Sequence, residues 1–223
     1  MYRWWVVGLL LVLVAGCGGR AQPAPVNAQG EVIDLPLPRL EGERSLEETL
    51  ARRHSVRSFI DAVLTWEEVG QLLWAAQGIT RDWGARTAPS AGALYPLEVY
   101  VATAEGVYRY MPQGHRVAVL SGADRRPALW QAGLNQDAIR QAPAVFVVAG
   151  VYARTAAKYG DRAQRYVHLE AGHAAQNLLL QAVALDLGGV PIGAFQDKQV
   201  QAALGMPEDH APLYLVPVGH PKE

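Results

Sequence analysis

The sequence predicts an α+β fold in which a central antiparallel or mixed sheet is flanked by helices. Half of the 223 residues are hydrophobic and 18% are charged, a balance that allows one sizeable buried core. Strand-like and helix-like segments follow one another without the regular strand–helix–strand rhythm of a doubly wound sheet. No internal repeat is visible, and the length suits one domain.

Charge and cysteine content exclude several classes of function. Twenty basic and 21 acidic side chains leave a formal net charge of −1, so there is no basic surplus for a nucleic-acid backbone. The chain has one cysteine, which excludes a disulfide framework and a multi-thiolate metal site built from one chain. We therefore expect no nucleic-acid partner.

The N-terminus resembles a bacterial lipoprotein signal. Arg3 precedes an apolar stretch of about a dozen residues, short of the ~20 that span a bilayer comfortably, and Val14-Ala15-Gly16-Cys17 resembles a lipobox. We expect residues 1–16 to be a signal peptide and Cys17 to carry the lipid. An uncleaved anchor helix is the alternative. Both interpretations predict a membrane-anchored protein, and lipidation predicts the periplasmic or cell-surface side.

A flexible tether is expected at residues 17–44, which are rich in glycine, proline, alanine and glutamine and show no helical or strand period. Within it, residues 32–38 alternate weakly and are expected to form an extended arm. Ser45, followed by two glutamates, is typical of a capped helix start, here running to about His54. The folded domain is accordingly predicted at residues 45–223.

Further elements follow in order. Thr65 caps a second helix that ends at Gly78. Alternating segments predict an antiparallel meander, and a continuous apolar run predicts a buried strand. The expected strands are 97–103, 107–110, 116–120, 144–151 and 213–218, and the expected helices are 126–134, 135–141, 161–187 and 197–204.

The long helix at 161–187 carries most of the information. Its second half, residues 178–187, is apolar nearly all round and is expected to be central. Tyr166, Glu170, His173 and Asn177 share one face. The Glu-x-x-His spacing occurs in di-iron sites, but the second copy that such sites need is missing. A polar seam facing a cofactor or another subunit is favoured, and no metal is expected.

Three clusters carry candidate chemistry. Arg53, His54, Ser55 and Arg57 offer forked donors that suit a phosphate, although this cluster alone favours a solvated basic turn at a helix end. The loop at 87–96 is small and apolar and fits neither a phosphate-binding P-loop nor a nucleophile elbow. The turn at 188–195 is rich in glycine, so its backbone N–H groups suit a flavin ring edge. The alternatives are an ordinary surface connection for the loop and a plain helix-to-helix turn for the segment at 188–195.

Taken together, these clusters resemble the nitroreductase family, and within it the flavin dehydrogenases that include thiazoline and oxazoline oxidases. The resemblance covers about residues 45–221. It rests on Arg53-x-Ser55-x-Arg57-x-Phe59, on the run from Pro89 to Glu98 and on the helix segment from Glu170 to Leu178. In the C-terminal half it rests on Pro191 to Asp197, Leu204 to Pro207 and Val216 to Pro221.

The resemblance implies a nitroreductase-like sheet flanked by helices in an intertwined homodimer, with FMN in two clefts at the interface. The phosphate would meet the basic cluster, and Lys222 is the remaining basic residue beyond the final Gly-x-Pro. The flavin-lining residues implied are Pro89, Ser90, Ala91, Gly92 and Leu94, with Ile192, Gly193 and Ala194 near its N5 edge.

The implied reaction is two-electron transfer through flavin N5. Lys158-Tyr159 resembles the Lys-Tyr pair that assists proton removal in azoline oxidases, while a solvated helix-start residue is the alternative for the lysine. The substrate, a small molecule or a peptide, is not specified. The rival hypothesis is a non-catalytic, membrane-anchored binding lipoprotein that keeps the same fold.

Overall fold

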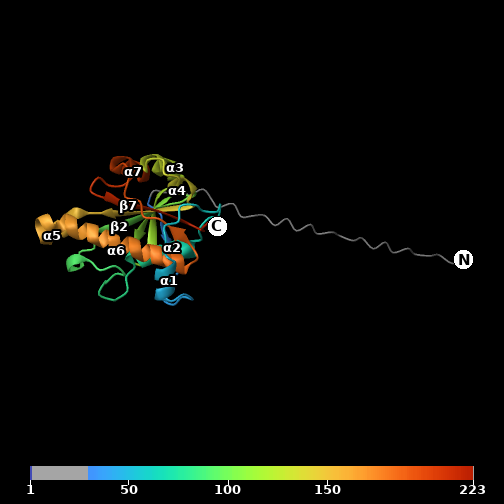
Figure 1. Cartoon of the computed structure of the whole chain (residues 1–223), viewed down its shortest axis with the longest axis horizontal. Helices are drawn as coiled ribbons and strands as arrows, with labels where there is room; N and C mark the ends of the chain where they lie inside the picture. Colours follow the sequence, from blue (N-terminus) through green and yellow to red (C-terminus); the bar gives the residue numbers. More distant parts are fainter. Residues whose placement is uncertain (2–29, 223) are drawn as a thin grey trace.

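A single seven-stranded sheet with antiparallel pairing throughout forms the centre of the molecule, which confirms the α+β prediction (Figure 1). The computed structural model describes Met1 and residues 30–222. The strand order is β1-β4-β3-β2-β5-β7-β6. The strands are β1 Val32–Asp34, β2 Leu97–Ala102, β3 Val107–Met111, β4 Arg116–Ser121, β5 Ala144–Gly150, β6 Gly188–Gly189 and β7 Ala211–Gly219.

Helices cover both faces of this sheet. Figure 1 shows α1, α2 and α6 on one side and α3, α4 and α7 on the other. The helices are α1 Leu46–Arg52, α2 Trp66–Gln77, α3 Arg126–Ala132, α4 Asp137–Gln141, α5 Tyr152–Tyr159, α6 Ala163–Ala184 and α7 Asp197–Leu204, with short 3₁₀ turns η1 Ala91–Ala93 and η2 Gly160–Arg162.

Alternation along the strands builds two cores. Val99 and Val101 of β2 pack with α2 and α6, whereas Tyr100 and Ala102 face the side of α3, α4 and α7. All seven residues of β5 are buried, because helices cover both of its faces. The predicted central segment of α6 contributes Leu178, Leu179 and Ala182 to the first core.

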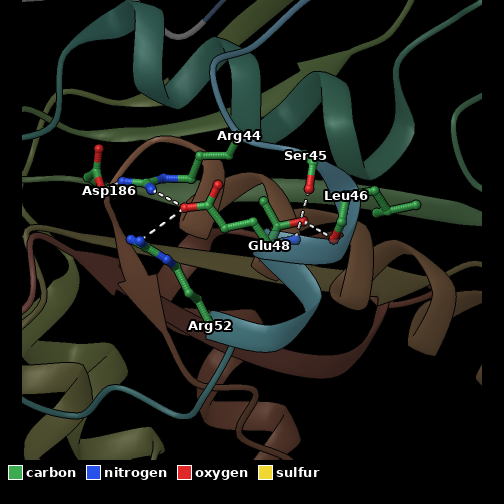
Figure 2. Close-up of polar contacts among 7 residues, drawn as sticks. Arg44, Ser45, Leu46, Glu48, Arg52 and Asp186 are labelled. Carbon is green, nitrogen blue, oxygen red and sulfur yellow. Dashed lines mark hydrogen bonds and ion pairs between the residues drawn. The ribbon is translucent and has the colours of Figure 1, made fainter.

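Helix capping explains why α1 and α2 begin where the sequence predicts. The Ser45 hydroxyl accepts from the Glu48 backbone N–H (3.1 Å), and Thr65 and Glu68 form a complete capping box. Figure 2 shows how the Glu48 carboxylate also joins Arg44 (2.7 Å) and Arg52 (3.0 Å). This network fixes α1, whose C-terminal cap is Arg53.

The folded region begins earlier than the sequence analysis placed it. Val32–Asp34, expected to be an extended arm within a tether, pair with β4 as an edge strand. Leu35 is buried in the first core. The Arg39 backbone N–H donates to Gln71 Oε1 (2.8 Å), and Arg44 also pairs with Asp186. Residues 32–44 therefore belong to the domain. The sequence pattern did not predict this, because the partners of these residues lie far away along the chain.

Helix α5 has no counterpart in the prediction, which started the long helix at residue 161. Its first residue follows Val151, which provides no side-chain cap, so the usual start pattern is missing. Gly160, with φ of +53°, and the turn η2 separate α5 from α6.

The predicted signal peptide at residues 1–16, apart from Met1, and the lipidation site Cys17 lie outside the described residues. Within residues 30–222, no helix is long and apolar enough to cross a membrane.

Candidate functional site

The basic cluster lies immediately after α1 and runs beside β6. Ser55 forms a parallel bridge with Gly189, and the Val56 backbone N–H donates to the Gly189 carbonyl (3.1 Å). Val56 is buried, whereas Arg53 is half-buried and His54, Ser55 and Arg57 are exposed. The backbone is thus held in place while the polar side chains remain accessible.

Glycine at 188 permits this close approach. A Cβ atom built on Gly188 would lie 2.5 Å from Val56 Cγ2, so a larger residue would push the basic segment away. The segment and the glycine-rich turn, two clusters more than 130 residues apart in sequence, are therefore brought together. Of the turn, Ile192 pairs with Leu215, Gly193 and Ala194 are exposed, and the Ala194 carbonyl accepts from Gln136 (2.9 Å).

The backbone of Lys222 is bound beside residues 58–60, directly after the basic cluster. The Lys222 backbone N–H donates to the Ser58 carbonyl, and the Ile60 N–H donates to the His220 carbonyl, both at 3.0 Å. Within residues 30–222, no ion pair involves Arg53, Arg57 or Lys222. Because these cations have no carboxylate partner there, the donor set fits an anionic group such as a phosphate.

The loop at 89–95 is a tight turn. The Ser90 hydroxyl accepts from the Tyr95 backbone N–H (2.9 Å). Gly92, Ala93 and Tyr95 have φ angles of +63°, +54° and +46°, a conformation that is costly for residues with a side chain. Pro89 and Gly92 are exposed, and Ser90, Ala91 and Leu94 are half-buried.

Lys158 and Tyr159 lie against this loop. A Cβ atom on Gly92 would lie 2.9 Å from Tyr159 Oη and 3.1 Å from Lys158 Nζ, so the glycine leaves room for both polar groups. Tyr159 packs edge-to-face on Tyr166 of α6, with ring centroids 5.0 Å apart. The candidate proton-transfer pair and the candidate flavin loop are therefore neighbours.

The predicted polar seam on α6 faces the same region. Besides Tyr166, Asn177 Nδ2 donates to the Thr87 carbonyl (3.3 Å). Glu170 is 3% exposed, and its burial raises the pKa of its carboxyl to about 7, while Ser90 and Arg86 oppose this rise. His173, on the same stripe, is exposed.

The sequence did not predict a group of charged residues behind the loop, namely Arg86, Glu98 and Arg154. The Arg86 guanidinium lies over the Tyr95 ring (4.5 Å) and donates to Gln77 Oε1 (2.7 Å). Burial lowers the pKa of Arg86, while Glu98 and Glu170 oppose this effect. Arg154 donates to the Tyr95 carbonyl (3.2 Å) and to Glu98 (2.5 Å). These side chains come from separate segments and form no motif.

The predicted site residues thus gather in two groups within one chain. One contains the basic segment, the glycine-rich turn and Lys222; the other contains the loop at 89–95 with Lys158 and Tyr159. Figure 1 shows α5, against which the loop packs, at the left of the domain, and the C-terminus, which pairs with residues 58–60, at the right. A single chain therefore does not bring the two groups together.

Comparison with known proteins gives a consistent result. The family model described as "Nitroreductase family" matches residues 50–220. A nitroreductase candidate from Methanocaldococcus jannaschii is 43% identical over 196 residues, which cover 85% of this chain and 98% of that protein. An NADPH-flavin oxidoreductase from Vibrio harveyi is 32% identical over 112 residues, or 47% of each chain.

A solved structure supports the same assignment. The crystal structure of a nitroreductase candidate from Ralstonia eutropha superposes with a TM-score of 0.77 at 29% identity, covering 91% of this chain and 95% of that one. The region matched by the family model, residues 50–220, contains the basic segment, the loop and the glycine-rich turn. The chain belongs to the nitroreductase family.

Proposed function

We propose that this protein is an FMN-dependent oxidoreductase that acts as a homodimer. The observation that carries the proposal is the basic group: Arg53, Arg57 and Lys222 have no acidic partner within residues 30–222. Backbone contacts hold their segments together, between Ser55 and Gly189 and between Lys222 and Ser58. Guanidinium groups bind phosphate oxygens through two parallel hydrogen bonds. Arg53, His54, Ser55, Arg57 and Lys222 would hold the FMN phosphate.

The remaining predicted residues fit the flat ring system. Pro89 to Leu94 present small side chains that let the backbone approach a planar ligand closely, and Ile192 to Ala194 would lie near its N5 edge. When bound, the flavin supplies two-electron chemistry, and the protein supplies orientation and electrostatics.

We further propose that the protein dehydrogenates an azoline-like ring in a small molecule or a peptide. Such a substrate gives a hydride to the flavin and a proton to a base. Lys158 Nζ and Tyr159 Oη lie beside Gly92 of the loop, where they can assist in removing that proton.

A homodimer follows from the separation of the two groups. Because the basic group and the loop lie apart in one chain, a complete flavin site needs the basic group of one protomer and the loop of its partner. Sites shared in this way are compatible with the two-fold symmetry of a dimer.

The test is the absorption spectrum of purified protein. We expect flavin bands that bleach on addition of a reductant and return with a suitable electron acceptor. Protein that binds no FMN when titrated would contradict the proposal. FMN that binds but cannot be reduced would favour the rival hypothesis of a binding lipoprotein.

We also propose that the chain is a lipoprotein held on the outer side of a membrane through Cys17, on the basis of the lipobox-like Val14 to Cys17. Two or more acyl chains anchor a protein far better than one. Cys17→Ala is expected to leave an uncleaved, unacylated precursor. If this variant keeps the same mature mass and the same membrane fractionation, the proposed lipidation at Cys17 is wrong.

A further inference from the structure

Helix α5, which carries the candidate proton-transfer pair, is too short to be stable by itself. It has eight residues, whereas isolated helices shorter than about 12 residues are marginal in water. Within residues 30–222, no side chain caps its first turn, and Thr155 is its only buried residue. Figure 1 shows α5 at the left edge of the domain. Its position therefore depends on a small number of contacts with the rest of the chain.

One face of α5 packs against α6. Tyr152, Thr155 and Tyr159 follow at spacings of three and four, so they share this face. Tyr152 Oη lies 2.6 Å from His168 Nε2, and the Tyr159 ring packs edge-to-face on Tyr166. These contacts join the two helices, but they do not join α5 to the candidate flavin loop.

A second face of α5 meets that loop. Arg154 and Lys158 are four residues apart, so they lie one above the other on the helix. Arg154 Nη1 donates to the Tyr95 carbonyl (3.2 Å), and Nη2 donates to Glu98 Oε1 (2.5 Å). Lys158 Nζ lies 3.1 Å from a Cβ atom built on Gly92. Arg154 thus binds the end of the loop, while Lys158 lies against its centre.

The carboxylate that binds Arg154 is firmly placed. Glu98 belongs to β2, which pairs with β3 on one side and β5 on the other, and its side chain is 15% exposed. A partly buried ion pair is screened by salt less than an exposed one. The guanidinium holds its donors in a rigid fork, so one side chain can bind the carboxylate and the Tyr95 carbonyl together. Arg154 is therefore a fixed connection between α5 and the sheet.

We propose that Arg154 is a positioning residue that joins α5 to the candidate flavin loop through Tyr95 and Glu98. This connection holds Lys158 and Tyr159 beside the loop. The part that concerns proton transfer rests on the proposed function. Without the connection, α5 keeps its contacts with α6 but is no longer held against the loop.

The first experiment needs no flavin. Hydrogen–deuterium exchange of residues 152–159 and 89–96 is compared between wild type and Arg154→Gln. We expect both segments to exchange about fivefold faster in the variant, which corresponds to ~1 kcal/mol, while β5 exchanges as in the wild type. Arg140→Gln is the matched control, because it removes an arginine–aspartate pair on α4 (2.9 Å). It should leave both segments unchanged.

Further variants test whether Arg154 acts through Glu98. Arg154→Lys should recover part of the protection, because an ammonium group does not reproduce the fork. Glu98→Gln should also speed the exchange of both segments. The double variant should exchange no faster than Arg154→Gln, because the two residues act through one contact. Additive effects would overturn the connection, and Glu98→Gln supplies the test if Arg154→Gln does not fold.

The second experiment uses the FMN-loaded protein without oxygen and a peptide that contains a thiazoline ring. The ring gives a hydride to the flavin and a proton to a base, and so becomes a thiazole. We expect Arg154→Gln to slow the bleaching of the flavin by saturating peptide about tenfold, because the base is misplaced. FMN affinity and bleaching by dithionite, which needs no base, should match the wild type. A residue that serves stability alone would give no such contrast.

The two experiments separate the failure of this inference from that of the proposed function. Wild-type protein whose flavin the thiazoline does not bleach would contradict the proposed dehydrogenation, and the exchange data would still decide whether Arg154 positions α5. Wild-type exchange of residues 152–159 in both Arg154→Gln and Glu98→Gln would overturn the inference, whether or not flavin binds. Faster exchange with unchanged bleaching by the thiazoline would also overturn it, because the proton-transfer pair would then not depend on Arg154.

Discussion

Exposure divides the polar residues of the candidate site by role. Arg57, Ser55 and Lys222 are exposed beside a fixed backbone, so their side chains are free to meet a ligand. Glu170 is buried, so its protonation is coupled to the stability of the fold. The two kinds of residue therefore call for different measurements, ligand affinity for the first and pH dependence for the second.

Replacement of Arg57 tests the phosphate assignment. Arg57→Ala removes a charge-assisted hydrogen bond worth ~1.5 to 3 kcal/mol, so FMN affinity should fall roughly ten- to a hundredfold. Riboflavin affinity should hardly change, and Arg57→Lys should recover part of the loss, because a point charge does not reproduce the fork. Titration by flavin fluorescence gives both values. Equal weakening of the two ligands would show that the phosphate lies elsewhere.

Glu170 should also make stability depend on pH. Its pKa in the folded chain is raised from 4.5 to about 7, so between these values the folded state holds a proton that the unfolded state has lost. The resulting stabilisation is present at low pH and is lost as the pH rises through about 7, by up to about 3 kcal/mol. Denaturant unfolding of wild type and Glu170→Gln at pH 5 and pH 8 measures it. A stability difference between the two proteins that is the same at both pH values would contradict the assignment.

At the scale of elements, the sequence predicts those helices and strands that are determined by residues close together in the chain. The starts of α1 and α2 are predictable because Ser45 and Thr65 cap them within three residues. The buried strand β5 and the helix α7 are predictable from their apolar pattern. The edge strand β1 is not, because its partner β4 lies more than 80 residues away. Helix α5 lacks a capping side chain, which explains its omission.

The same distinction applies to the site. Arg53 to Arg57 and the loop at 89–95 are visible as short motifs, whereas Arg86 and Arg154 meet at Tyr95 only through the fold. The burial of Glu170 was not evident, because its neighbours Tyr166 and His173 at the helical spacing are polar and gave the appearance of a polar seam. The structure buries Glu170 and leaves His173 exposed.

The N-terminal limit of the fold can be tested by truncation. A chain that begins at residue 45 loses the pairing of β1 with β4, the burial of Leu35 and both hydrogen bonds between Arg39 and Gln71. Burial of one leucine contributes ~1.5 to 3 kcal/mol and each hydrogen bond ~1 kcal/mol. We expect the chain that begins at residue 45 to be at least about 3 kcal/mol less stable than a chain that begins at residue 30, as measured by denaturant unfolding. Equal stability of the two chains would mean that residues 30–44 are only an appendage.

At the scale of the whole molecule, the proposed flavin site is divided between two regions of one chain, so the proposal requires a second copy. The basic group and the loop pack against different elements, β6 with the C-terminal segment in one case and α5 with α6 in the other. Light scattering after gel filtration should give twice the mass of one chain for the flavin-loaded protein. A flavin-loaded species at the mass of one chain, 24.2 kDa or less after processing, would contradict the shared site.

A mixture of two defective chains distinguishes a shared site from two sites that each belong to one chain. Arg57→Ala damages the basic group, and Gly92→Val damages the loop, because a β-branched residue is strained at φ of +63° and would meet Tyr159 and Lys158. Each homodimer should fail to bind FMN at a concentration that saturates the wild type. In a heterodimer with shared sites, one site combines both defects and the other combines two intact halves. Purified heterodimers carrying two different tags should then hold about half of the wild-type FMN per dimer, as two-fold symmetry requires. If each site belonged to one chain, both sites of the heterodimer would remain defective and no FMN would bind.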